Sequence, residues 1–264
     1  MHGLGIFPGG SARGELGMTP RNASAAVIGA GDYIGAAIAK RFAAEGFIVH
    51  AGRRNGDKLA PLVHDIEATG GRIAARSLDA RKEGDIAAFL SAAEVAAPLS
   101  VCVFNVGANV NFPLVGTSER VFRKVWEMAC YAGFLAGREA ARLMLPRGQG
   151  AIFFTGATAS LRGGIGYAAF AAAKFGLRAV AQSAARELGP KGIHVAHLII
   201  DAGVDTAWVR ERIRVREGDA ALENLDSGRL MRPEAVADAY WMLYQQRRDA
   251  WSSEMTIRPF GETW

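Results

Sequence analysis

The sequence predicts one α/β domain, built as a doubly wound parallel sheet of about seven strands with helices on both faces. Short apolar runs of strand length alternate along the chain with longer segments of helical periodicity. Strict alternation is typical of parallel sheets, because each connecting helix packs back onto the sheet. The chain has 264 residues, 50% hydrophobic and 22% charged, which suits one globular unit.

The elements follow from local patterns. Apolar runs predict strands at 23–31, 47–55, 72–80, 99–107, 150–160, 194–201 and 254–259. Apolar residues at helical spacing predict helices at 33–46, 57–71, 83–97, 117–145, 165–188 and 233–246. Gly46 and Pro98 end helices, while Pro233 stands in a first turn, where helices accept proline. The charged segment 205–230 breaks the alternation, and we expect it to form a lid.

Bulk properties exclude several classes of protein. No apolar run approaches the roughly 18–20 residues that a membrane span needs. Residues 1–21 are glycine-rich and lack a signal peptide's pattern, so we expect a flexible leader before a single domain at 22–264. Cys102 and Cys130 form no disulfide framework, which favours a cytoplasmic setting.

Charge and histidine patterns exclude two further kinds of partner. The net charge of +5 comes from scattered basic residues with acids between them, so we expect no nucleic-acid partner. The five histidines show no ligand spacing, so we expect no metal. A small-molecule substrate is the expected partner.

A glycine-rich turn follows the first expected strand and opens the first helix. Gly29, Gly31 and Gly35 lie in the stretch VIGAGDYIGAA, together with Tyr33 and Ile34. Glycines here let the backbone turn tightly and approach a pyrophosphate at the helix N-terminus. This loop therefore predicts a Rossmann-type dinucleotide site. A tight strand–helix turn without a ligand is the alternative.

This loop is similar to the T-G-x-x-x-G-x-G loop of the short-chain dehydrogenase/reductase family. Gly29 and Gly35 match its first and last glycines, with Ile28 at the threonine and Tyr33 at the middle glycine. Three further stretches fit, and the resemblance covers about residues 22–260. They are Asp79-Ala80 after the third strand, NVG at 105–107 after the fourth, and DAGVDT at 201–206. The resemblance implies cofactor contacts from Asp79, Ala80, Asn105, Gly107, Lys174, Val204 and Thr206.

The second expected strand ends in the stretch AGRRN, where an acidic residue would bind the ribose hydroxyls of NAD. Arg53 and Arg54 stand there instead. Their guanidinium groups suit a 2′-phosphate, which favours NADP (NADPH) over NAD. Two solvated surface arginines are the alternative.

The resemblance implies a proton-donating tyrosine, a lysine four residues later, an upstream serine and an asparagine on the preceding helix. Lys174 in GYAAFAAAKFG matches the lysine. Phe170 stands at the tyrosine, Ala157 at the serine and Cys130 at the asparagine. Loss of a general acid removes about 10²–10⁴ in rate. The family's usual mechanism therefore does not run as written.

Neighbouring residues offer substitutes. Tyr167 shares a helical face with Phe170 and Lys174, and supplies a phenol. Thr158 and Thr155 flank Ala157 and carry hydroxyls; strand alternation predicts that Thr155 and Ala157 point the same way. The catalytic candidates are thus Lys174, Tyr167 and Thr158. Lys174 either holds the cofactor ribose or acts as an amine of lowered pKa in an apolar pocket. A solvated surface lysine is the alternative.

Three functions stay open. The first is an oxidoreductase dependent on NADP that acts on a carbonyl or alcohol with a non-standard proton donor. The second is a non-redox enzyme on the same scaffold, a lyase, isomerase or dehydratase, and the third is a catalytically inactive binding protein. The alanine-rich helix at 165–188 resembles the family's dimer helix, which implies a homodimer or homotetramer.

Overall fold

The computed structural model describes residues 20–223 and 228–262, so residues 1–19 of the expected leader lie outside the described part. A seven-stranded, all-parallel sheet forms its centre, in the order β3-β2-β1-β4-β5-β6-β7. The strands are β1 Ser24–Ile28, β2 Ile48–Arg53, β3 Arg72–Ser77, β4 Leu99–Phe104, β5 Gly150–Ala157, β6 Ile193–Ile200 and β7 Glu254–Ile257. The expected fold is confirmed.

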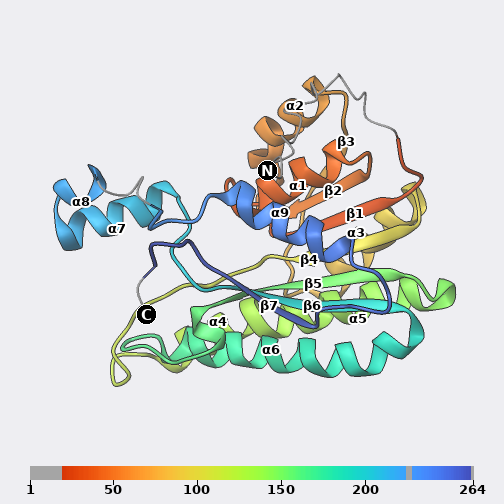
Figure 1. Ribbon diagram of the computed structural model, residues 1–264. Coiled ribbons are helices and arrows are strands. Elements are labelled where there is room, and N and C mark those ends of the chain that lie inside the picture. Colours follow the sequence, from red (N-terminus) through yellow and green to blue (C-terminus); the bar gives the residue numbers. More distant parts are fainter. Residues whose placement is uncertain (1–19, 224–227, 263–264) are drawn as a thin grey trace, which may run out of the picture.

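Helices cover both faces of the sheet (Figure 1). The long ones are α1 Ile34–Ala44, α2 Ala60–Ala68, α3 Glu83–Ala96, α5 Ala132–Met144, α6 Ala168–Leu188 and α9 Pro233–Tyr244. The others are α4 Glu119–Trp126, α7 Ala207–Glu217 and α8 Ala220–Glu223. No helix within the described residues is both long and apolar enough to cross a membrane.

Strand alternation divides the core in two. In β1, Ala25 and Val27 face the core beneath α1, α2 and α9, while Ala26 and Ile28 face the core beneath α3, α5 and α6. Both layers are buried, which explains why the central strands consist of continuous apolar runs rather than alternating ones.

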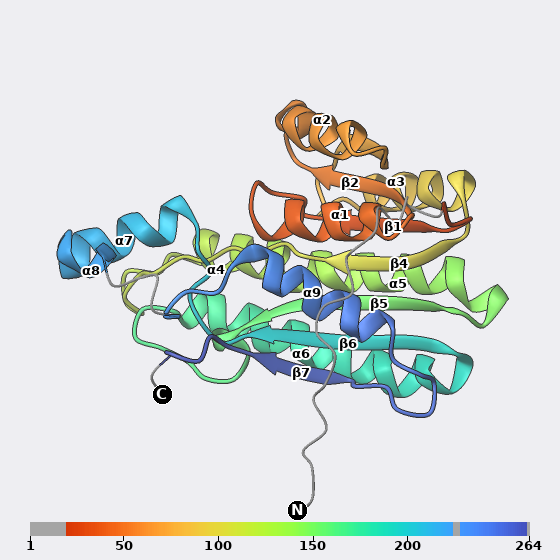
Figure 2. The ribbon, with the colours of Figure 1, turned by 45° about the horizontal axis from the view of Figure 1, so that its top comes forward.

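The strand order reverses between β1 and β4, because the chain winds one way through β3 and then returns through β7. In doubly wound sheets the cleft lies at this point, outside the carboxyl ends of the strands. Helices α7 and α8 project beyond that edge of the sheet (Figures 1 and 2). The described parts of the expected lid segment, residues 205–223 and 228–230, therefore stand at the mouth of the cleft.

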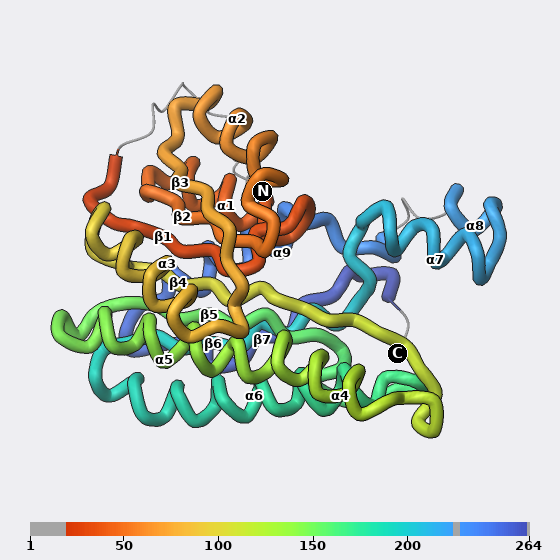
Figure 3. Tube along the Cα trace, turned by 180° about the vertical axis from the view of Figure 1, so that it is seen from behind, coloured from red at the N-terminus to blue at the C-terminus, as the bar shows by residue number. Residues whose placement is uncertain are grey.

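One expected element differs. The single helix predicted at 117–145 is divided by a π-helical segment, Glu127–Tyr131, between α4 and α5. A π-turn accommodates an extra residue and rotates the next part of the helix, and this one buries both Ala129 and Cys130 against α6. Figure 3 shows α5 and α6 running side by side along the same face.

Candidate active site

The glycines after β1 divide into two kinds. Gly29 has φ +90°, and a Cβ there would lie 2.8 Å from the Asn105 carbonyl oxygen. At Gly35 a Cβ would lie 2.3 Å from the Gly29 oxygen, so both glycines are required by the turn. A Cβ at Gly31 or at Gly107 would meet nothing within 4 Å. These two positions leave the backbone open towards the cleft, as a dinucleotide requires.

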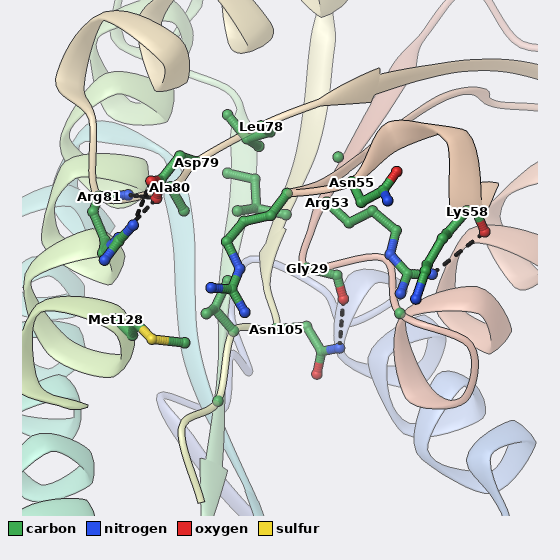
Figure 4. Close-up of a pocket in the computed structure, with 16 residues that line it drawn as sticks. Gly29, Arg53, Asn55, Lys58, Leu78, Asp79, Ala80, Arg81, Asn105 and Met128 are labelled. Atoms are coloured by element: carbon green, nitrogen blue, oxygen red, sulfur yellow. Dashed lines mark hydrogen bonds and ion pairs between the residues drawn. The ribbon is translucent and has the colours of Figure 1, made fainter. Parts of the chain in front are cut away.

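A cavity of about 520 Å³ extends from this loop across the ends of β2 and β3 (Figure 4). It gathers eight of the residues selected from sequence: Gly29, Gly31, Arg53, Arg54, Asp79, Ala80, Asn105 and Gly107. It is also lined by Asn55, Lys58, Leu78, Arg81 and Met128, which sequence reasoning missed. We call it the first cavity.

The two arginines after β2 have different surroundings. The guanidinium of Arg53 donates to the Asp32 carboxylate at 2.6 Å and to the Lys58 carbonyl at 3.4 Å. Arg54 is exposed and lines the first cavity, with no carboxylate partner among the residues the structure describes. Arg54 is therefore the guanidinium available to a phosphate, while Arg53 is largely neutralised.

At the opposite wall, Asp79 follows β3 and is held by Arg81. Arg81 donates from Nε at 2.9 Å and from Nη2 at 2.6 Å to the two carboxylate oxygens. This hydrogen bonding lowers the pKa of Asp79 to about 2. The carboxylate is therefore ionised and fixed in position throughout the physiological pH range.

The other residues selected for cofactor contact lie outside the first cavity. Ile34, the first residue of α1, and Val204 pack against the core layer that α1 and α9 cover. Thr206 caps α7, because its hydroxyl accepts a hydrogen bond from the Val209 amide at 3.1 Å. The phenol of Tyr33 accepts a hydrogen bond from the Ala207 amide at 3.1 Å. Tyr33 thus links the glycine loop to the start of α7.

Asn105 connects the glycine loop to the inner core. Its Nδ2 donates to the Gly29 carbonyl at 3.1 Å, and its Oδ1 accepts from the Thr155 hydroxyl at 3.0 Å. The same hydroxyl lies 2.6 Å from that of the buried Tyr240. Thr155 therefore faces α9, whereas Ala157 packs near Phe170 on the α6 side. Ala157 is the last residue of β5 and still pairs with Ile200, and a 3-10 turn begins at the next residue, Thr158.

Lys174 is only 3% exposed and has no carboxylate partner among the described residues. Its Nζ donates to the carbonyls of Thr155 at 2.7 Å and Val106 at 3.4 Å. Burial lowers the pKa of Lys174 to about 8, so this amine loses its proton far more readily than a surface lysine. Among the interpretations of Lys174, a solvated surface lysine is thereby excluded.

A second cavity, of about 870 Å³, lies between the end of β5, the start of α6 and helix α7. Thr158 and Tyr167 line it, and so do Ala157 and Phe170, which stand at the expected serine and tyrosine positions. The Tyr167 hydroxyl accepts from Nη2 of Arg212 at 3.1 Å. Because that bond uses an oxygen lone pair, the phenol hydrogen points elsewhere, with no acceptor among the residues described.

Cys130 occupies the expected asparagine position. Its thiol lies against α6, where a Cβ on Gly176 would come within 2.8 Å of Sγ. Burial raises the pKa of the Cys130 thiol, which disfavours a thiolate nucleophile. Within the described ranges no three His, Cys, Asp or Glu side chains are grouped to hold a metal.

Several residues that shape the second cavity escaped sequence reasoning, among them Arg162, Trp208, Arg212 and Arg229. Three of them lie in the segment 205–230, whose charge marks it as a surface feature without indicating which side chains turn inward. The sequence signal that could have found this pair is the four-residue spacing of Trp208 and Arg212 in a helix, which brings the two side chains together. In the structure the guanidinium of Arg212 stacks on the Trp208 ring.

The reversal of strand order, the glycine loop and the first cavity define a nucleotide-binding α/β protein of the doubly wound class. The chain belongs to the short-chain dehydrogenase/reductase family of oxidoreductases, because residues 23–216 match the family model described as short chain dehydrogenase.

Curated relatives share part or most of the chain. The short-chain dehydrogenase/reductase eriH of Hericium erinaceus is 33% identical over 175 residues, covering 64% of this chain and 69% of its own. The (3R)-3-hydroxyacyl-CoA dehydrogenase of Canis lupus familiaris is 29% identical over 241 residues, covering 84% and 89%.

Solved structures agree with the fold. A short-chain dehydrogenase from Rhodopseudomonas palustris is 66% identical, with a TM-score of 0.79 over 91% of this chain and 100% of that one. A variant of the actinorhodin polyketide ketoreductase with NADPH, 23% identical, has a TM-score of 0.83 over 91% and 98%.

Proposed function

We propose that the protein is an oxidoreductase dependent on NADP(H) that interconverts a carbonyl and an alcohol, with Tyr167 in place of the usual proton donor. The observation that carries the proposal is the first cavity, which brings the open glycines, Asn105 and the unneutralised Arg54 to one cleft. Related structures that contain NADPH or NADP support this choice of cofactor.

In this proposal the residues of the first cavity divide the binding of the dinucleotide. The backbone at Gly29, Gly31 and Gly107 would receive the pyrophosphate and nicotinamide side, and the fixed Asp79 carboxylate would accept from the adenine. Arg54, joined by Lys58, would bind the 2′-phosphate. The other selected positions, Tyr33, Ile34, Gly35, Val204 and Thr206, would support this cleft from outside.

When bound, the cofactor supplies or accepts the hydride; the chain's own residues manage the proton. The Tyr167 hydroxyl donates its hydrogen to the carbonyl oxygen, while Arg212 stabilises the phenolate that remains. Thr158, on the wall of the same cavity, donates a second hydrogen bond to that oxygen. Lys174 contributes positive charge beneath the cleft, held by two backbone carbonyls.

The cofactor assignment is tested by titrating the protein with NADPH and NADH and following the nicotinamide fluorescence. Arg54→Gln should weaken NADPH about tenfold or more and leave NADH unchanged, because it removes a charged hydrogen bond to the phosphate alone. Arg186→Gln, a surface change on α6, is the matched control. If neither NADPH nor NADH binds, the oxidoreductase assignment is refuted.

One observation favours a second candidate, a non-redox enzyme or a binding protein on the same scaffold. Phe170 and Ala157 both line the second cavity without a hydroxyl, so the family's proton donor is absent from the place where substrate would lie. Normal NADPH binding combined with no turnover of any carbonyl or alcohol would favour this candidate.

The proposal includes a homodimer or homotetramer in the cytoplasm. Large apolar side chains are exposed on α4, α5 and α6, namely Phe122, Trp126, Phe134 and Phe175, each 41–42% exposed. Such a patch suits a helix-to-helix interface. Both cysteines are free and buried, as suits a reducing compartment. Light scattering coupled to gel filtration tests the assembly, and a monomer would contradict it.

A further inference from the structure

The second cavity has an unusual wall of arginines. Arg162, Arg212, Arg216 and Arg229 all line it, and Glu262 is the one acid among those lining residues that the structure describes. An excess of guanidinium groups over carboxylates destabilises the fold by charge repulsion unless ligands or neighbouring carboxylates neutralise it.

Nearby carboxylates neutralise part of this charge. Arg162 lies 3.4 Å from Asp201, but Arg258 shares that buried carboxylate at 3.2 Å. Arg216 and Arg229 likewise share Glu217. Each carboxylate therefore faces two guanidinium groups, and the cavity keeps a surplus of positive charge.

Arg212 is the guanidinium within this wall that has no ion-pair partner among residues 20–223 and 228–262. It stacks on the ring of Trp208, with Cζ 4.7 Å from the ring centroid. Its Nη2 donates to the Tyr167 hydroxyl at 3.1 Å. Stacking fixes the plane of the group and leaves the rest of its donor fork pointing into the cavity, ready for a planar anion.

We propose that the second cavity receives an oxo acid or the corresponding hydroxy acid, with its carboxylate on the fork of Arg212 and its reacting carbon beside Tyr167. The inference rests on the proposed function for the identity of the reacting carbon, but not for the binding of the anion. Because Arg212 and the Tyr167 hydroxyl are in hydrogen-bond contact, the carboxylate and the carbonyl they bind lie close together in the substrate. This geometry selects acids whose carbonyl is one or two bonds from the carboxylate, such as 2-oxo and 3-oxo acids.

Trp208 adds a second preference. Its indole is 51% exposed and lines the cavity beside the guanidinium, so it offers an apolar surface to the substituent next to the carboxylate. An aromatic oxo acid satisfies both features. Benzoylformate, with a ketone, a carboxylate and a phenyl ring, is a suitable probe, and its methyl ester keeps the shape without the charge.

The test compares these two compounds by isothermal titration calorimetry, with and without NADP⁺. Benzoylformate should bind the wild-type protein about tenfold to hundredfold more tightly than methyl benzoylformate, because one charged hydrogen-bonded pair is lost in the ester. Arg212→Gln should abolish that preference. Arg214→Gln removes the same charge from the same helix at a residue paired with Glu211 outside the cavity, and should keep it.

Equal binding of acid and ester by the wild-type protein overturns the inference, as does failure of the acid to bind. Equal loss of preference in Arg212→Gln and Arg214→Gln also overturns it, since the effect would then come from the general field of α7. Absence of NADP⁺ binding with the preference for the acid intact refutes the proposed function and supports the anion site. The two ideas can therefore fail separately.

Discussion

Lys174→Met tests the electrostatics at the centre of the site. The ammonium is buried against the carbonyls of Thr155 and Val106 with no carboxylate to balance its charge among the described residues. Methionine has nearly the same length and apolar stem but cannot be protonated. The substitution therefore removes one buried titration while keeping most of the packing.

The expected magnitude follows from linkage. Burial lowers the pKa of Lys174 from 10.5 to about 8. Below the folded value both states carry the proton, so the folded state bears the full cost of burying a charge. As pH rises above the folded value, the folded lysine loses its proton before the unfolded one does, and stability rises. Between pH 7 and 10 the wild-type protein should gain about 2–3 kcal/mol of stability relative to the methionine variant.

Urea denaturation of both proteins at several pH values in that range measures the effect. Other groups whose pKa is raised by burial, such as Cys102 and Tyr240, are present in both proteins and cancel in the difference. Lys191→Met, at a half-exposed lysine near Glu187, is the control and should show no such slope. A difference between wild type and Lys174→Met that stays constant with pH would refute the assignment of a buried, unbalanced ammonium.

Three more changes probe other parts of the molecule. Gly35→Ala should lower the melting temperature by several degrees, because its Cβ would meet a backbone oxygen at 2.3 Å. Gly107→Ala is the control and should melt as wild type, because its Cβ would meet nothing within 4 Å. Similar melting temperatures for the two variants would contradict the contact argument. Tyr167→Phe should lower kcat for ketone reduction about 10²–10⁴-fold without changing NADPH affinity, and unchanged kcat would exclude this phenol as the donor. The double change Phe170→Tyr and Ala157→Ser should raise reduction of generic ketones measured by NADPH oxidation, and no gain would mean the cavity serves other chemistry.

The sequence predicts the fold well because its signals are local. The apolar runs, the glycines after β1 and the proline opening α9 each specify one short stretch of backbone, and the parallel sheet follows from their order. The first cavity is predicted for the same reason. Its residues sit at the ends of consecutive strands, which parallel topology brings to one edge.

The features that escaped prediction depend on contacts between distant segments. The sequence pattern places the Tyr33 ring where a phosphate approaches, but its hydroxyl bonds to Ala207, 174 residues away. Thr155 follows the strand pattern, but the hydrogen bonds of its hydroxyl to Asn105 and Tyr240 join segments that are 50 and 85 residues away in the sequence. The π-helical segment before α5 leaves no trace in apolar spacing, because the same residues fit a regular helix.

The way Lys174 and Asn105 are bonded bears on how such enzymes diverge. Each donates to main-chain carbonyls, so each carries part of the folding free energy as well as any role in chemistry. Ala157 and Phe170 offer no hydrogen bond and border open space, so a hydroxyl can be gained or lost there with little effect on folding. Selection for a stable fold alone thus retains Lys174 and Asn105, and lineages on this scaffold can exchange one chemistry for another without first becoming unstable.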